Sequence, residues 1–264
     1  MQTTMEPGAA NESLRGSFQR DGYVVVRGFL DPDALAELRA ELARYIRDVV
    51  PTLPDSHAFY LDKSRPETLK QLQHMGCDPY FAEIWKRPSW LALVESLLGE
   101  SVQPAEPEWF NKPPRSESPT PPHQDNYYFC LRPPSVLTLW IALEPVDEEN
   151  GCLRYLPGSH REGIRPHGAS RILGFSQGIR EYTAEDAARE VPIRLGSGDA
   201  VLHHGNMIHR ADPNGSETRS RSAFAVVYRG VSATRDAAAF ERYQTELRRQ
   251  HEALGLQVDD KAAS

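Results

Sequence analysis

Basic residues are too few in this sequence to give it a positive charge. The 264 residues include 30 Lys and Arg against 37 Asp and Glu, which gives a formal net charge of −7 at pH 7. Nucleic acids and anionic membrane surfaces attract basic patches. The composition therefore argues against either of them as the main partner.

Long apolar segments are absent as well. The longest uninterrupted apolar run, residues 223–228, has six members, whereas a membrane-spanning helix needs ~20. The N-terminal stretch MQTTMEPGAANE contains neither a basic segment nor an apolar one, so no signal peptide is visible. We expect a soluble protein that is not exported.

Cysteine is scarce. Cys77, Cys130 and Cys152 form an odd, scattered set without a Cys-X-X-Cys pair. Secreted proteins of this size typically pair their cysteines in disulfides, whereas cytosolic proteins keep them reduced. The set therefore predicts reduced thiols and a cytoplasmic location.

What is present is typical of a folded protein, with 39% hydrophobic and 25% charged residues. Sandwiches and barrels often reach ~250 residues as one unit, so we expect a single domain over residues 1–264. Within it we expect a flexible leader at 1–12, an N-terminal strand and helices at 13–100, a β-rich core at 101–230, and a C-terminal helix and tail at 231–264.

The N-terminal part predicts one strand and two helical stretches. Residues 22–26 are rich in Val and read as a buried strand. Asp31 and Pro32 are typical of a helix N-cap and first turn, and apolar residues then recur at helical spacing to Val49. A second helical stretch is expected over 78–98, divided at Pro88.

After residue 100 the pattern changes to short strands separated by turn residues, which favours a sandwich or barrel. The stretch 112–122 contains five prolines and is expected to be a loop. Residues 161–190 have no clear period and are expected to form a long insertion. The strands are expected at 108–112, 136–143, 152–156, 191–195, 200–204 and 222–228.

The triplet His123-Gln124-Asp125 carries the first chemical signal. In a strand, residues i and i+2 point to the same face, so the imidazole and the carboxylate would project together. Two histidines and one carboxylate form the facial triad of non-heme Fe(II) oxygenases. A distant histidine, His209, follows a predicted strand and could supply the third ligand. Arg221 lies 12 residues further along the chain, and an arginine side chain can bind a carboxylate through two hydrogen bonds.

Four blocks of the sequence, in order, resemble the phytanoyl-CoA dioxygenase family, a branch of the Fe(II)/2-oxoglutarate-dependent oxygenases. The third block, Asn150 to His160, is similar to the family's NG-x-L-x-x-x-PGSH motif. The family commonly has His-Gly-Ser where this chain has His209-Arg210-Ala211. The four blocks are residues 18–30, residues 122–125 with 138–143 after them, residues 150–160, and residues 204–221.

The resemblance implies a mainly β protein with flanking helices and a double-stranded β-helix (jelly-roll, cupin-like) core. It implies that iron is held by His123, Asp125 and His209, and that Arg221 pairs with the distal carboxylate of the co-substrate 2-oxoglutarate. Arg219 is a rival for that role on the same strand face. Further residues that the resemblance places at the co-substrate pocket are Trp140, Lys112 and Gln124.

The reaction implied is hydroxylation of an unactivated C–H bond of a small molecule, with O2 consumed and 2-oxoglutarate converted to succinate and CO2. Related halogenases have Ala or Gly where this chain has Asp125, so halogenation is not expected. Two other classes remain open: a catalytically silent jelly-roll binding module, and a cupin-type metal-dependent isomerase or hydrolase that does not use 2-oxoglutarate. Substrate contacts are expected from residues 51–76, 116–122 and 161–190.

The other histidines have simpler explanations. We expect His203 to pack on the opposite strand face and His204 to be structural, with its ring hydrogen-bonded in the barrel. We expect His160 to fix a turn near the pocket mouth. The histidines expected to be solvated are His57, His74, His167 and His251.

Overall fold

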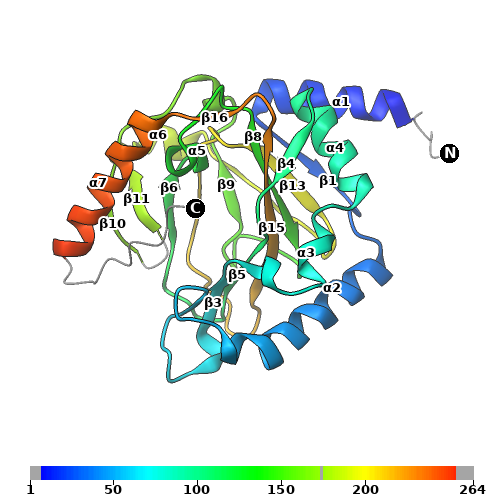
Figure 1. The fold of residues 1–264 in the computed structure, drawn as a ribbon, viewed down its shortest axis with the longest axis vertical. Coiled ribbons are helices and arrows are strands. Elements are labelled where there is room, and N and C mark those ends of the chain that lie inside the picture. Colours follow the sequence, from blue (N-terminus) through cyan, green and yellow to red (C-terminus); the bar gives the residue numbers. More distant parts are fainter. Residues whose placement is uncertain (1–6, 173–174, 254–264) are drawn as a thin grey trace.

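Two antiparallel sheets face each other in the computed structural model, which describes residues 7–172 and 175–253 (Figure 1). They form the jelly-roll core, so the predicted fold class is confirmed. The strand order of the large sheet is β1 (Tyr23–Val26), β13 (Ala200–His204), β8 (Val136–Ala142), β15 (Arg221–Gly230), β5 (Glu108–Lys112), β3 (Leu69–Leu72) and β2 (Ala58–Tyr60), with β4 (Val102–Pro104) also pairing with β15. The order of the small sheet is β12 (Val191–Pro192), β9 (Leu153–Tyr155), β14 (His209–Ala211) and β6 (Thr120–His123).

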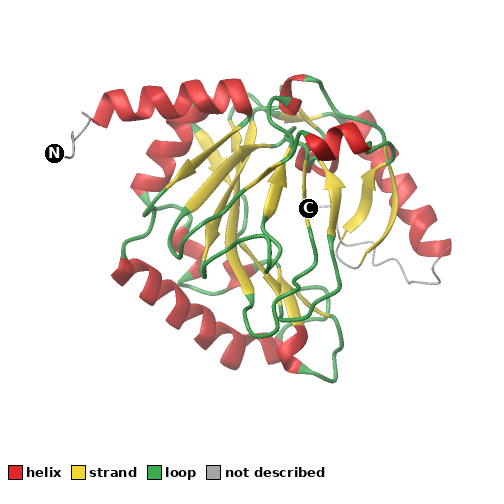
Figure 2. Cartoon of the chain, turned by 180° about the vertical axis from the view of Figure 1, so that it is seen from behind, coloured by secondary structure: helices red, strands yellow, loops and turns green. Residues whose placement is uncertain are grey.

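Helices cover the outer face of the large sheet (Figures 1 and 2). Strand β8 is buried along its whole length because it has one face toward these helices and one toward the small sheet. Its Leu137, Leu139 and Ile141 pack into the core under the helices, whereas Trp140 and Ala142 pack between the two sheets. The covering helices are α1 (Pro7–Asp21), α2 (Pro32–Arg44), continued by a π-helical turn (Tyr45–Val49), α3 (Phe81–Ile84) and α4 (Pro88–Leu98).

The predicted start of α2 is confirmed. The carboxylate of Asp31 accepts a hydrogen bond from the backbone N–H of Ala34 at 2.8 Å, and Pro32 occupies the first turn. Pro88 divides the next helical stretch, as expected, because α4 begins at this residue. Gly99 ends α4 in the left-handed conformation with φ 78°, which glycine adopts without steric cost.

Helix α7 lies next to the β10–β11 hairpin, at the side of the molecule away from α1 and α4 (Figure 1). Short 3-10 turns cover Val50–Thr52, Pro66–Thr68, Met75–Cys77 and Ser159–Arg161. The remaining elements are α5 (Asp125–Phe129), α6 (Ala184–Ala188), α7 (Ala237–Ala253), β7 (Leu131–Arg132), β10 (His167–Ile172), β11 (Phe175–Ile179) and β16 (Thr234–Arg235).

Two local predictions were wrong, one at the N-terminus and one at Asp125. Helix α1 begins at Pro7, within the segment expected to be a flexible leader. The insertion predicted at 161–190 does lie between β9 and β12, and it contains the β10–β11 hairpin and α6, which begins with a capping box of Thr183 and Asp186. The strand expected to run through residues 123–125 ends at His123, and Asp125 begins α5. Residues 254–264, the end of the predicted C-terminal helix and tail, lie outside the described residues.

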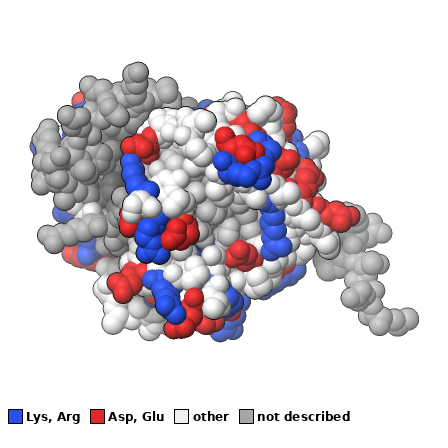
Figure 3. Space-filling view, turned by 90° about the horizontal axis from the view of Figure 1, so that it is seen from below, with Lys and Arg blue, Asp and Glu red and all other residues white. Residues whose placement is uncertain are grey.

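Charged side chains of both signs are interspersed on the face shown in Figure 3, without a patch of one sign. Among the helices in the described part of the chain, none is long and apolar enough to cross a membrane.

Candidate active site

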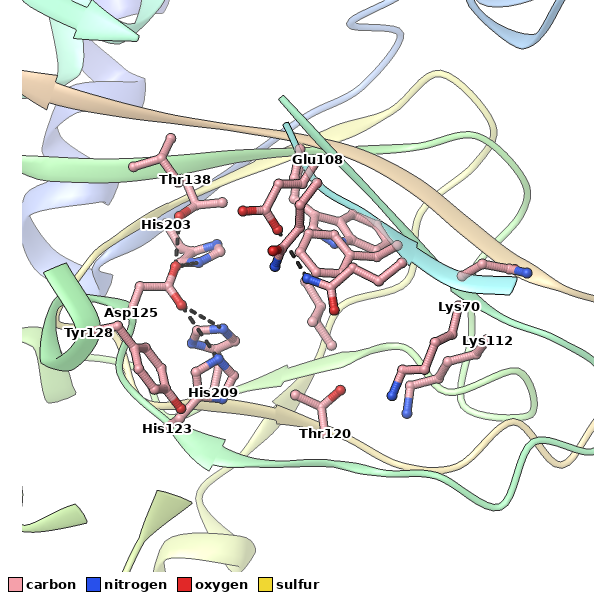
Figure 4. Close-up of a pocket in the computed structure, with 18 of the residues that line it drawn as sticks. Lys70, Glu108, Lys112, Thr120, His123, Asp125, Tyr128, Thr138, His203 and His209 are labelled. Carbon is pink, nitrogen blue, oxygen red and sulfur yellow. Dashed lines mark hydrogen bonds and ion pairs between the residues drawn. The ribbon is translucent and has the colours of Figure 1, made fainter. Parts of the chain in front are cut away.

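His123, Asp125 and His209 meet inside the jelly roll, although they come from three different elements. His123 ends β6, His209 begins β14, and these two residues pair across the small sheet. Asp125 follows one extended residue, Gln124, and therefore still faces the two rings (Figure 4). The Nε2 atoms of His123 and His209 lie 3.4 and 3.6 Å from the Oδ1 atom of Asp125. The three ligand atoms lie within 4.8 Å of one another, so one cation can contact all of them.

The backbone orients both rings. The Nδ1 atom of His123 lies 2.8 Å from the carbonyl oxygen of Pro121, and that of His209 lies 3.0 Å from the carbonyl oxygen of Met207. A carbonyl can only accept, so each Nδ1 must carry the proton and each Nε2 presents its lone pair toward Asp125. This is the arrangement of metal-bound histidines, in which the second nitrogen donates to a carbonyl or carboxylate.

The second oxygen of Asp125 has its own partners. Its Oδ2 atom accepts hydrogen bonds from Thr138 Oγ1 at 2.7 Å and from His203 Nε2 at 3.1 Å. The Nδ1 atom of His203 lies 2.8 Å from the hydroxyl of Tyr155, which completes a buried chain of hydrogen bonds. Burial alone would raise the pKa of Asp125, but His209 and the other two histidines hold this pKa well below its usual range. The carboxylate is therefore ionised and fixed in orientation.

The position of His203 differs from the prediction, which assigned this residue to packing on the opposite strand face. The register places it beside Thr138 of β8, on the inner face of the sheet. His204 points the other way and accepts a hydrogen bond from the backbone of Asn206, as expected for a structural histidine. In a His-His pair on a strand one ring must face inward, and this was the available signal.

A cavity of about 330 Å³ opens beside the three residues. Its walls come from β3, β5, β8 and β15, and one end of it is cationic. Lys112 of β5 pairs in register with Arg221 of β15, and Lys70 lies next to Lys112 (Figure 4). Aromatic side chains that line the cavity are Phe110, Tyr128, Phe129, Trp140 and Tyr243, and carboxylates that line it besides Asp125 are Glu106 and Glu108.

Burial perturbs the charges at the cationic end. It lowers the pKa of Arg221 to about 10, and together with the neighbouring cations it lowers the pKa of Lys112 to about 6. The guanidinium of Arg221 lies 5.5 Å from the ring centre of Trp140, and its buried Nε atom has no hydrogen-bond partner. Lys112 donates to the carbonyl oxygen of Ser118 at 2.7 Å. The buried guanidinium of Arg221 thus gives this end of the cavity a positive charge.

The two arginines considered for the co-substrate carboxylate, Arg219 and Arg221, lie in different surroundings. Arg219 lies at the surface, with 35% of its side chain exposed, and its guanidinium pairs with Asp147 and Glu149. Arg221 is buried and lines the cavity. Arg210, in the segment that departs from the family pattern, pairs with Glu190 away from the cavity.

Gln124 does not reach the cavity, in contrast to the expectation. Its Nε2 atom donates to the carbonyl oxygens of Gly163 and Asn206, and its Oε1 atom accepts from the backbone N–H of Arg165. These hydrogen bonds therefore join the loop that follows β9 to the turn that follows β13. Trp140 and Lys112, in contrast, lie on the cavity wall as predicted.

Another histidine is placed differently from the prediction. His167 is buried and stacks on Tyr127 with ring centres 3.9 Å apart, and burial lowers its pKa to about 4. His160 contacts the backbone of Gln19 in α1 at 3.2 Å, near the turn that it was expected to fix. The side chain of His251 lies outside the described residues.

Comparison with known protein families gives a match to the model described as phytanoyl-CoA dioxygenase, over residues 18–223. The peroxisomal phytanoyl-CoA dioxygenase of Bos taurus is 28% identical over 230 residues, which cover 82% of this chain and 68% of the relative. Phytanoyl-CoA dioxygenase domain-containing protein 1 of Mus musculus is 33% identical over 252 residues, covering 79% of this chain and 86% of the relative.

Solved structures are similar over most of the chain. The non-heme alpha ketoglutarate dependent epimerase SnoN from nogalamycin biosynthesis has a TM-score of 0.68 at 26% identity, over 86% of this chain and 83% of that chain. A second structure of SnoN holds Fe3+, alpha ketoglutarate (2-oxoglutarate) and nogalamycin RO. Its TM-score is 0.71 at 23% identity, over 97% of this chain and 93% of that chain.

Proposed function

Because the chain belongs to the phytanoyl-CoA dioxygenase family, we propose that it hydroxylates a C–H bond of a small molecule at the site formed by His123, Asp125 and His209. The protein is an Fe(II)/2-oxoglutarate-dependent oxygenase, and its co-substrates are 2-oxoglutarate and O2. The observation that carries the assignment of the site is the convergence of two imidazole nitrogens and one carboxylate oxygen beside a cavity.

The three residues fit an iron ion. Both Nε2 lone pairs face the Oδ1 atom of Asp125, while the other hydrogen-bonding atoms of the three side chains are occupied by carbonyls, Thr138 and His203. Two imidazoles and one carboxylate on one side of a cavity are the ligand set of non-heme Fe(II) oxygenases. When bound, the iron activates O2 and couples the decarboxylation of 2-oxoglutarate to the oxidation of a substrate.

We assign the cationic end of the cavity to the distal carboxylate of 2-oxoglutarate. Arg221 suits this role because its buried Nε atom has no partner in the free protein and a carboxylate would supply one. Lys112 lies in register beside it and adds a second donor. Trp140 supports the guanidinium from one side.

The protein itself orients and shields the reacting groups. Thr138, His203 and Tyr155 fix the carboxylate of Asp125, so that the ligand set is formed before the metal arrives. The walls of the cavity are largely apolar, which limits the access of water to the bound co-substrate. Because Asp125 fills the position that is Ala or Gly in related halogenases, we propose hydroxylation rather than halogenation.

The experiment is a screen with the Fe(II)-loaded protein, 2-oxoglutarate and O2. Acyl-CoAs, amino acids, phosphonates and natural-product scaffolds are added in turn, and succinate is measured together with a product that has gained one oxygen atom. We expect one class to increase succinate formation in a 2-oxoglutarate-dependent reaction. If 2-oxoglutarate does not bind, the result would favour a catalytically silent binding module. Turnover of a substrate without O2 would favour a cupin-type metal-dependent isomerase or hydrolase.

We further propose a cytoplasmic location. Cys77, Cys130 and Cys152 are free, and Cys130 and Cys152 are buried, which is consistent with a reducing compartment. Fractionation of cells that produce the protein tests this location. Recovery in an organelle or outside the cell would contradict it.

A further inference from the structure

The cavity beside the triad has a second polar end, formed by Glu108. Strand β5 directs Glu108, Phe110 and Lys112 to the same face because side chains alternate along a strand. Four residues at ~3.3 Å each place the two charged ends roughly 13 Å apart along the strand. Lys112 lies opposite Arg221 in the register, whereas Glu108 lies opposite Ala225.

Glu108 lies close to the iron ligands rather than to the cations. In Figure 4 it is seen on the side of Thr138 and His203, and Lys70 and Lys112 occupy the other end. If 2-oxoglutarate extends from Arg221 to the triad, as the proposed function requires, it leaves Glu108 for the substrate. The carboxylate is thus placed to contact a substrate that is bound next to the iron.

The surroundings of Glu108 leave its negative charge poorly compensated. Its Oε2 atom accepts a hydrogen bond from Gln71 Nε2 at 3.2 Å. Burial raises its pKa to about 7, Gln71 lowers this pKa, and the charge of Asp125 raises it. Among the described residues no cation pairs with Glu108, so a cation supplied by the substrate would stabilise its ionised form.

The remaining lining of the cavity also favours a cation. Phe110 lies two residues from Glu108 on the same strand face, and Trp140 and Tyr128 line the same cavity. Aromatic ring faces attract ammonium groups, and the attraction is stronger where the groups are desolvated. A carboxylate among aromatic rings is the chemistry that binds a protonated amine.

We propose that Glu108 determines substrate specificity by binding a protonated amino group of the substrate. This inference rests on the proposed function, because it assigns the substrate class of the same site. Glu108 pairs with the ammonium group and thereby places a nearby C–H bond of the substrate beside the iron. Substrates that carry a neutral group at this position are bound less well.

The test compares two probes of the same length, hexylamine and hexan-1-ol, at pH 8, where Glu108 is ionised and the amine is protonated. Each probe is titrated into the anaerobic Fe(II)- and 2-oxoglutarate-loaded protein in a calorimeter. A charge-assisted hydrogen bond in a buried site predicts that the wild-type protein binds hexylamine about tenfold more tightly or better. We expect Glu108→Gln to remove this preference, and Glu108→Asp, which keeps the charge, to retain part of it.

Glu106→Gln provides the matched control. Glu106 also lines the cavity, but it is 48% exposed and pairs with His74 at 3.0 Å, so its loss should leave the preference unchanged. Equal binding of the two probes by the wild-type protein would overturn the inference, and this comparison needs no variant that might not fold. A preference that survives in Glu108→Gln would overturn it equally.

A titration of each protein with 2-oxoglutarate separates this inference from the proposed function. If 2-oxoglutarate binds and the amine preference is absent, only the role of Glu108 is refuted. If the wild-type Fe(II)-loaded protein does not bind 2-oxoglutarate, the proposed function is refuted together with the role of Glu108.

Discussion

Replacing Arg221 by Gln should weaken the binding of 2-oxoglutarate without destabilising the free protein. Arg221 lines the cavity with a buried Nε atom that has no partner. A hydrogen bond from a charged donor to a carboxylate contributes about 1.5–3 kcal/mol. Its loss corresponds to a roughly 10- to 100-fold higher dissociation constant for 2-oxoglutarate.

The stability of the free protein provides the second part of this prediction. Burial lowers the pKa of Arg221 to about 10, well below its ordinary value, and at 1.36 kcal/mol per pKa unit this costs the folded state about 3 kcal/mol. At pH 7 the folded and unfolded states both carry the charge, because this pH lies below both pKa values, so the full cost applies. The contact between the Arg221 guanidinium and the Trp140 ring offsets on the order of 1 kcal/mol of this cost. The free energy of unfolding of the apo variant should therefore not fall below that of the wild type.

Arg219→Gln is the matched control. Arg219 is partly exposed and pairs with Asp147 and Glu149 at the surface, where ion pairs contribute about 0–1 kcal/mol. Calorimetric titration of the Fe(II)-loaded proteins with 2-oxoglutarate, together with urea unfolding of the apoproteins, measures both quantities. Weakened 2-oxoglutarate binding in Arg219→Gln but not in Arg221→Gln would refute the assignment. A marked loss of stability in Arg221→Gln would refute the argument about the buried charge.

Two further predictions concern the same cavity. Burial and the neighbouring cations lower the pKa of Lys112 to about 6 in the free protein, so its amine is neutral at pH 7.5. Binding of the 2-oxoglutarate dianion should raise this pKa, so that the protein takes up as much as one proton. Calorimetric titrations with 2-oxoglutarate in buffers of different ionisation enthalpy measure this uptake. Thr138→Val removes one hydrogen bond to Asp125 and should weaken Fe(II) binding about 10-fold or more, as measured by anaerobic metal titration.

Controls for these two predictions come from the same chain. Lys112→Met should abolish most of the proton uptake, and the same uptake in the variant would show that another group titrates. Thr52→Val changes an exposed threonine that bonds to the backbone of Val49, and it should leave metal binding unchanged. An equal loss of iron affinity in both threonine variants would contradict the role given to Thr138.

Local signals in the sequence predicted the elements that depend on local chemistry. Asp31 and Pro32 start α2 and Pro88 starts α4, because a capping carboxylate and a fixed φ act within one helical turn. The strand at 136–143 was visible because both its faces are buried and all its residues except Thr138 are apolar. The positions of the triad residues were visible through their spacing and the family blocks around them.

The features that the sequence did not reveal depend on register and on contacts between distant segments. The His203-His204 pair indicates that one of the two rings faces inward, but only the pairing of His203 with Thr138 shows which one. Glu108 and Lys70 become cavity residues only when β3 and β5 pair at the edge of the large sheet. His167 is buried because the β10–β11 hairpin folds against α7, and this hairpin lacked a recognisable period.

The most direct test of the central claim is succinate formation by alanine variants of the triad. Fe(II), 2-oxoglutarate and O2 are supplied in excess, and succinate is measured for the wild type, for His123→Ala, Asp125→Ala and His209→Ala, and for His204→Ala, a strand histidine outside the cavity. We predict 2-oxoglutarate-dependent succinate formation in the wild type and in the control, and its loss in the three triad variants. Full turnover in the triad variants would contradict the assignment of the iron site.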